Sequence, residues 1–253
     1  MSIESKLRDA GLSGRDVVDL RRRVFMQRGL SLSALTLLTG CDITDTKPVD
    51  SFLRMIGRIN DGVQGALFRP HKLARTFPES MVPKEFRFNA QYGAGRVPII
   101  NPQTWRLELS GLISDNRPWS LEQLQSMPQS SYVARHVCVE GWSMIGKWGG
   151  VPLKTLFERI GADLRAKYVA FRCDDPINYS SSIDMASALH PQTILCLTYA
   201  DRPIEPKFGA PMRLKMTTKL GFKQPKHVTS IQVTNEYPGG YWEDLGYNWF
   251  AGV

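Results

Sequence analysis

The sequence predicts an α+β fold that is rich in β-strands and contains short helices. Two observations support this prediction for the 253-residue chain. Short apolar runs with strand-like patterning recur along residues 104–234 and alternate with brief segments of helical spacing. Sixteen prolines and 21 glycines indicate frequent turns between short elements. Hydrophobic residues make up 42% of the chain and charged residues 22%, which is typical of a soluble globular protein.

The first element after residue 41 is a predicted amphipathic helix over residues 48–68. Its apolar positions recur at helical spacing: Phe52, Ile56, Ile59, Val63 and Leu67. Asp50 is a plausible N-cap, and we expect the apolar face to pack on the main domain. Residues 69–104 are rich in Pro, Gly, Arg and Phe without periodicity, so we expect a long extended segment there.

Strands and short helices then alternate. Strands are predicted over residues 104–113, 131–139, 167–173, 194–200, 211–217 and 227–234. Short helices are predicted over 120–127, 152–161 and 183–189. Ser120 and Gln123 fit a capping box, while Pro152 and Gly161 suit a helix start and end. No internal repeat is visible, and one α+β domain is the most economical interpretation.

The charge is moderate and dispersed. The formal net charge is +8, of which residues 1–40 contribute +3, and no Lys/Arg run follows residue 28. Nucleic-acid binding would require a clustered basic stripe. We therefore expect a mildly basic solvated surface, with room for an anionic ligand inside, and no nucleic-acid partner.

The N-terminus has the pattern of an export signal. Arg22 and Arg23 precede Phe25 and Met26, as in the twin-arginine motif. The apolar run 30–40 that follows is too short to be a stable membrane anchor. "LTGC" resembles a lipobox, with Cys41 as the lipidated residue; an ordinary cleavage site, or an amphipathic helix with a chance Arg pair, are the alternatives.

We accordingly divide the chain into three segments. Residues 1–40 are the signal segment, residues 41–82 a helix with an extended linker, and residues 83–253 the main domain. The expected location is the periplasm, with attachment to the membrane through a lipid on Cys41.

Cys138 is the cysteine that most needs an explanation. The chain has four cysteines, Cys41, Cys138, Cys173 and Cys196, without a CxxC or CxxCH motif. Cys138 follows a strand and precedes a Gly/Trp-rich turn, which would project a thiolate into a cleft. A soft thiolate suits a transition metal, and zinc is disfavoured because no second ligand lies at zinc spacing. A core thiol is the alternative. His136 would face the same side of the strand, as a donor near the metal or as a strand histidine.

The stretch "CVEGWSMIGKWGGVPL" (138–153) resembles the signature of the sulfite-oxidase-type molybdenum enzymes. The resemblance is greatest to the bacterial branch typified by periplasmic methionine sulfoxide reductase catalytic subunits. Further blocks in the same order, including "KYVAFRCDD" and "FGAPMRLKMTTKLGFKQPKHVTSI", extend it over about residues 83–250. The resemblance implies a β-rich domain around one molybdenum and a single molybdopterin, with Cys138 as the one protein ligand to the metal.

The resemblance also implies a cofactor-binding set. Its members are Asn89, Tyr92, Gly93, Cys138, Cys173, Arg213, Gln224, Pro225 and Lys226. The "NAQYGAG" segment matches the first pterin-binding segment, and Cys173 falls where reductase-like members have a Thr near the pterin. Arg213 matches an arginine that pairs with the cofactor phosphate, and "QPK" matches a loop at the same phosphate.

The chain departs from the family at several positions. Phe208 stands where members often have Asn or His. Phe88 and Ala90 replace the Arg and His of sulfite-oxidising members, and no basic segment follows Cys138. Sulfite in a partly dry pocket requires fixed positive charge. Together with the aromatic residues Trp142, Tyr241 and Trp242, these departures favour a neutral or zwitterionic substrate, although the aromatics could equally belong to the core.

We therefore expect an exported molybdopterin-dependent oxidoreductase that reduces sulfoxide-like substrates by oxygen-atom transfer. No haem, flavin or iron–sulfur motif is visible, so electrons should come from a membrane haem protein or a cytochrome c. Glu140 receives no catalytic role. Three alternatives stay open: a sulfite dehydrogenase, a cofactor-free binding lipoprotein, and a thiol-redox protein that uses Cys138 with Cys173 or Cys196.

Overall fold

The computed structural model describes residues 47–253, so the predicted export signal and Cys41 lie outside the described residues. The chain divides between Ile56 and Gly57, and the description below concerns the part from Gly57 onward unless stated otherwise. Helix α3 spans Lys47–Leu67 and includes Asp50 in its first turn, so Asp50 is not its N-cap. None of the described helices is long and apolar enough to cross a membrane.

One sheet has the strand order β2-β1-β10-β5-β6. Its strands are β1 (Arg106–Gly111), β2 (Trp119–Ser120), β5 (Tyr168–Cys173), β6 (Ser180–Asp184) and β10 (Val228–Thr234). β1 and β10 run parallel, and the other neighbours are antiparallel. The short strand β6 was not predicted, because four of its five residues are serine or aspartate and no alternating apolar pattern is visible.

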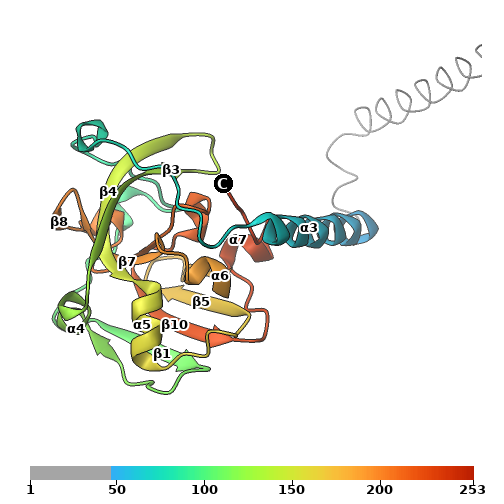
Figure 1. The fold of residues 1–253 in the computed structure, drawn as a ribbon. Helices are drawn as coiled ribbons and strands as arrows, with labels where there is room; N and C mark the ends of the chain where they lie inside the picture. The colour runs from blue at the N-terminus through green and yellow to red at the C-terminus, as the bar shows by residue number, and fades with distance from the viewer. Residues whose placement is uncertain (1–46) are drawn as a thin grey trace, which may run out of the picture. The chain divides into compact units, whose positions relative to one another are not determined.

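The second sheet has the order β3-β4-β7-β8, with β9 paired to β7. Its strands are β3 (Ser130–Val137), β4 (Ser143–Pro152), β7 (Ile194–Tyr199), β8 (Arg202–Pro203) and β9 (Arg213–Lys215). β3 and β4 form the long, curved, yellow-green hairpin in Figure 1. The predicted Gly/Trp-rich turn is therefore mostly strand β4. A Cβ at Gly150 would lie 2.0 Å from the Leu195 carbonyl oxygen, so glycine permits the close pairing of β4 with β7.

Short helices connect the strands. The α-helices are α4 (Leu121–Ser126), α5 (Leu153–Ile160), α6 (Met185–Ala188) and α7 (Tyr241–Asp244). The 3-10 turns are η2 (Glu79–Met81), η3 (Ala94–Arg96), η4 (Pro206–Phe208) and η5 (Gly221–Lys223). The predicted capping box of Ser120 and Gln123 is present, and Gly161 ends α5 in a left-handed conformation with φ +63°.

Strand β7 separates two hydrophobic clusters. Leu195 and Leu197 face a large core shared by the first sheet and α5. Ile194 and Cys196 face a smaller cluster that contains Trp148. Because side chains alternate along a strand, the second sheet is buried on both faces. The mixed arrangement of two sheets and short helices confirms the predicted α+β fold.

The apolar side of α3 is exposed rather than packed. Ile59 is 56% exposed, Val63 51% and Leu67 73%. On the opposite side of the helix, the Asp61 carboxylate accepts hydrogen bonds from Asn248 Nδ2 at 2.6 Å and from the Phe250 amide at 2.9 Å. The expectation that the apolar face packs on the main domain is wrong for these residues, because polar contacts attach the helix instead.

The large core depends on the apolar side of α5. Phe157 has no exposed surface, and its truncation would leave a cavity among packed neighbours. We expect Phe157→Ala to lower the free energy of unfolding by about 3–5 kcal/mol. Denaturant unfolding measures this, with Leu73→Ala at a 58% exposed position as the control. A loss in the first variant no larger than that in the control would contradict the assignment of the core.

Candidate active site

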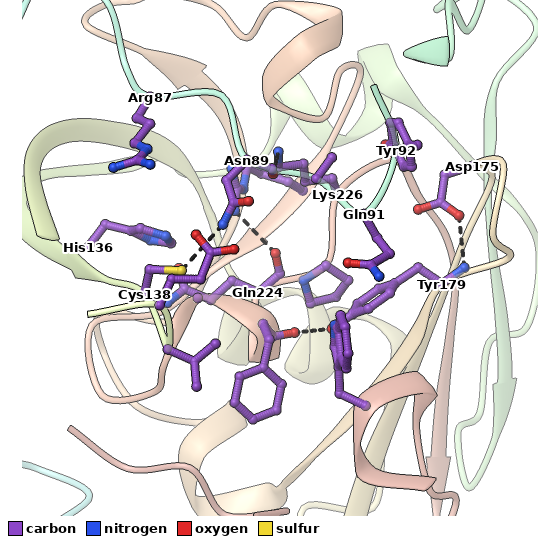
Figure 2. A pocket seen from close by; sticks show the side chains of 18 of the residues that line it. Arg87, Asn89, Gln91, Tyr92, His136, Cys138, Asp175, Tyr179, Gln224 and Lys226 are labelled. Atoms are coloured by element: carbon purple, nitrogen blue, oxygen red, sulfur yellow. Dashed lines mark hydrogen bonds between the residues drawn. The ribbon is translucent and has the colours of Figure 1, made fainter. Parts of the chain in front are cut away.

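Most of the residues that were predicted to bind the cofactor line one cavity (Figure 2). It is lined by seven of the nine predicted cofactor-binding residues: Asn89, Tyr92, Cys138, Arg213, Gln224, Pro225 and Lys226. They come from the extended segment before β1, the turn after β3, strand β9 and the loop before β10. Residues up to 137 positions apart in sequence therefore meet here, as the Lys226–Asn89 hydrogen bond illustrates.

Cys138 stands in the turn between β3 and β4. The Cys138 amide donates to the Trp142 carbonyl oxygen at 2.9 Å, which holds the turn closed. Asn89 Nδ2 donates to Cys138 Sγ at 3.3 Å. The side chain is 6% exposed, and burial raises the pKa of its thiol. Among residues 47–253, no group of three or more His, Cys, Asp or Glu side chains could hold a metal ion.

His136 lies on β3 and lines the same cavity. Its Nδ1 is 3.3 Å from Lys215 Nζ. Burial lowers the pKa of His136 well below its ordinary value, and the nearby charge of Lys215 lowers it further. The imidazole is therefore neutral at physiological pH. The side-chain hydrogen bond to Cys138 comes from Asn89 rather than from His136.

Arg213 and Lys226 line the cavity, and Lys215 is fully buried behind it, bonded to the lining residue Gln224. We call Arg213, Lys215 and Lys226 the cation cluster. On β9, Leu214 faces the large core, so strand alternation turns Arg213 and Lys215 to the other face. Arg213 donates to the carbonyl oxygens of Phe208 and Gln224, both at 3.1 Å.

The lysines of the cation cluster are also bonded only to uncharged groups. Lys215 donates to Gln224 Oε1 at 2.8 Å. Lys226 donates to the Asn89 carbonyl oxygen at 2.5 Å. In the described part of the chain, no carboxylate lies within ion-pair distance of any of the three.

Burial depresses the pKa values of the cluster, and the charge of Asp175, which also lines the cavity, offsets only part of this for Lys226. Burial lowers the pKa of Arg213 to about 10. Burial, followed by the charge of Arg213, lowers the pKa of Lys226 to about 7. For Lys215 the pKa is far below the ordinary lysine value, again mainly through burial. Buried cations of this kind are stable when an anion neutralises them.

The outer part of the cavity is aromatic and carries one arginine. The Arg87 guanidinium lies over the Trp142 ring, 4.9 Å from its centroid, and Trp142 Nε1 donates to Glu140 at 2.9 Å. Trp242 and Tyr247 line the cavity as well. Sequence reasoning missed Arg87 and Tyr247, and Arg87 adds a positive charge to the cavity that the interpretation of Phe88, Ala90 and the segment after Cys138 did not include. Arg87 stands two positions from Asn89 in a segment without periodicity, so no pattern marked it.

Four of the singled-out residues lie elsewhere. Gly93, Cys173, Phe208 and Tyr241 do not line the cavity. Cys173 packs in the large core, and burial raises the pKa of its thiol well above the ordinary value. Phe208 packs in the smaller cluster, next to Phe86. The cofactor roles of Gly93 and Cys173 stay predictions.

Comparison with known proteins identifies the class. A family model described as "Oxidoreductase molybdopterin binding domain" matches residues 94–242, more than half of the chain. The chain belongs to this family and is a molybdopterin-dependent oxidoreductase with a molybdenum–molybdopterin cofactor. The fold resembles that of the sulfane dehydrogenase SoxCD from Paracoccus pantotrophus, with a TM-score of 0.52, 18% identity, and coverage of 55% of this chain and 40% of that one.

Two relatives are informative. The chain is 54% identical over 231 residues to the "Putative protein-methionine-sulfoxide reductase subunit YedZ1" of Azospira oryzae, covering 91% of this chain and 87% of that protein. It is 30% identical over 189 residues to the protein-methionine-sulfoxide reductase catalytic subunit MsrP of Campylobacter jejuni, covering 67% and 63% respectively. The chain thus spans less than two thirds of that MsrP.

The residues present fit such a cofactor. A molybdopterin carries an anionic phosphate, and the cation cluster is a buried set of positive charges without a carboxylate partner. A thiolate is a soft ligand suited to such a metal, and Cys138 is the only cysteine that lines the cavity within residues 47–253.

The depressed pKa of Lys226 predicts a pH dependence in protein purified without molybdopterin. The folded state releases the proton near pH 7, whereas the unfolded chain keeps it to about pH 10.4. Between about pH 7 and about pH 10.4 the unfolded state binds more protons at this side chain, so its contribution to stability rises with pH. We expect Lys226→Met to remove up to about 1.4 kcal/mol per pH unit of this rise.

Denaturant unfolding at several pH values measures this slope. Lys154→Met, at a 55% exposed position on α5, is the matched control and should leave it unchanged. Equal slopes in the wild type and Lys226→Met would show that Lys226 is charged in the folded protein without its cofactor.

Proposed function

We propose that the chain reduces sulfoxides, with methionine sulfoxide as the representative substrate, by oxygen-atom transfer. The observation that carries this proposal is that one thiol, Cys138, lines the same cavity as two members of the cation cluster, Arg213 and Lys226. The stacked pair of Arg87 and Trp142 lines this cavity too. The relatives named as methionine sulfoxide reductase subunits support the substrate class. The overall reaction consumes two electrons and two protons and yields a thioether and water.

Each part of the cavity has a role in this proposal. Cys138 would hold the molybdenum, with Asn89 as a hydrogen-bond donor to its sulfur. Arg213 and Lys226 would hold the phosphate of molybdopterin. When bound, the molybdenum centre supplies two-electron oxygen-atom exchange. Trp142 provides an apolar wall for the methyl and methylene groups of a thioether side chain.

Arg87 is the residue that would orient the substrate. A sulfoxide oxygen carries partial negative charge and accepts hydrogen bonds, so a guanidinium is a suitable donor. Stacking on Trp142 restricts the guanidinium to one region of the cavity. One cationic donor beside an aromatic surface therefore supports a sulfoxide as substrate.

Arg87 also favours a second candidate, a sulfite dehydrogenase, because fixed positive charge would attract the sulfite dianion. The thiol-redox alternative has less support, since burial raises rather than lowers the pKa values of Cys138, Cys173 and Cys196. A cofactor-free binding lipoprotein would leave the cation cluster without its neutralising anion.

We further propose that the enzyme works in the periplasm and receives electrons from a haem-containing partner, either a membrane haem protein or a cytochrome c. The twin-arginine pattern at Arg22 and Arg23 and the lipobox-like "LTGC" support export and attachment through Cys41.

Removal of the thiol tests the metal role. We expect Cys138→Ser protein from a cofactor-producing host to lose most of its molybdenum and its sulfoxide reductase activity, because a hydroxyl is a harder and less acidic ligand. Elemental analysis and pterin fluorescence measure this. Cys196→Ser is the matched control, since Cys196 is buried outside the cavity. A full molybdenum complement in Cys138→Ser would refute the assignment.

Arg87→Gln tests the substrate role. Loss of one charge-assisted hydrogen bond should lower kcat/KM for methionine sulfoxide by roughly 10- to 150-fold, with unchanged molybdenum content. Arg135→Gln is the control, because Arg135 is exposed and lies outside the cavity. Assays of the wild type with methionine sulfoxide and with sulfite decide between the two candidates, and turnover of sulfite alone would replace the reductase proposal with the dehydrogenase.

A further inference from the structure

We propose that the exposed apolar side of α3, together with the basic segment that follows it, binds the surface of an anionic phospholipid membrane. This surface comprises Ile59, Val63 and Leu67 on the helix, and Arg69, Lys72, Leu73 and Arg75 after it. None of these residues lines the cavity that contains Cys138, so the inference does not depend on the substrate of the enzyme.

The orientation of the helix is fixed by polar contacts on its other side. Asp61 accepts two hydrogen bonds from the segment 248–250. Gln64 Oε1 accepts from the Gly252 amide at 3.1 Å, and Gln64 Nε2 donates to Asn248 at 3.2 Å. Ile59, Val63 and Leu67 lie on the opposite helix face by their spacing from Asp61. The apolar face is therefore held outward.

The sequence pattern continues this apolar stripe upstream. Ile56 and Phe52 precede Ile59 and Val63 at helical spacing. A helix with one apolar face and a charged opposite face is typical of helices that lie in a membrane interface. Since polar side chains attach α3 to the rest of the chain, its apolar face does not contribute to the core.

The segment after the helix adds positive charge beside this face. Residues 62–77 contain Arg69, Lys72 and Arg75 and no carboxylate. Their side chains are exposed, while the backbone is fixed: His190 Nε2 lies 3.0 Å from the Lys72 carbonyl oxygen, and the Ala74 amide donates to Gln192 at 2.8 Å. Exposed leucines alternate with these cations, at Leu67 and Leu73.

This combination of charges favours an anionic lipid surface over a second copy of the chain. A symmetric pair of copies would bring the basic segments together and repel. Phospholipid headgroups with negative charge would instead attract Arg69, Lys72 and Arg75, while the acyl boundary accepts the apolar side chains.

Vesicle co-sedimentation of the full chain carrying Cys41→Ser, which cannot be lipidated, tests the proposal. The probe is a vesicle of phosphatidylglycerol and phosphatidylcholine, with pure phosphatidylcholine for comparison. We expect Ile59→Ser/Val63→Ser to reduce partitioning by about tenfold or more, since burying one such side chain is worth roughly a factor of ten. Arg69→Gln/Lys72→Gln should lose the preference for anionic vesicles.

Met81→Ser, at an exposed apolar position outside this surface, is the control and should bind as the Cys41→Ser parent does. The N-terminal segment is common to all variants, so their ratios report the surface alone. Equal partitioning of Ile59→Ser/Val63→Ser and the parent, or absence of binding to anionic vesicles, would overturn the proposal. Concentration-dependent self-association without vesicle binding would also overturn the proposal and would indicate that a second copy of the chain covers this surface. Molybdenum content should be the same in every variant, which separates this result from the proposed activity.

Discussion

The cavity wall contains buried positive charge that forms no ion pair within the described chain. Arg213, Lys215 and Lys226 are bonded to carbonyl and amide oxygens and to one neutral imidazole, but to no carboxylate. Such groups are costly to bury, and the depressed pKa values of Arg213 and Lys226 express that cost. An anion bound beside these cations would offset the cost of burying them. The folded chain is therefore organised around a negatively charged group before any chemistry at Cys138 is considered.

Strand alternation explains how a hydrophobic sheet carries this charge. β9 pairs with β7, so Arg213 lies opposite Cys196 and Lys215 opposite Ile194. Leu214 and Leu195 face the large core from the same two strands. A one-residue slip of β9 would place the cations in that core and Leu214 in the cavity. The core thus fixes the register that positions Arg213 and Lys215, which is how packing in the large core determines the charge of the cavity wall.

Much of this could be predicted from local pattern. Strand periodicity placed β1, β3, β5, β7, β9 and β10, and the cysteine singled out after a strand, Cys138, lines the cavity. β4 was missed because its glycines, such as Gly150, serve close strand pairing rather than turns. Arg87 was missed because its position in the cavity depends on tertiary contacts with Trp142. The exposed face of α3 was misjudged because helical spacing shows that a face is apolar and does not show what covers it.

The C-terminal segment connects the cavity wall to helix α3. Glu243 on α7 forms a fully buried ion pair with Lys223 of η5 and accepts a hydrogen bond from Ser181 at 2.8 Å. The neighbouring Trp242 and Tyr247 line the cavity, and residues 248–252 hold the polar side of α3. Removing one partner of a buried pair leaves an uncompensated charge, so the pair resists displacement of α7. The aromatic wall of the substrate region and the outward orientation of the α3 apolar face therefore rest on the same anchored segment.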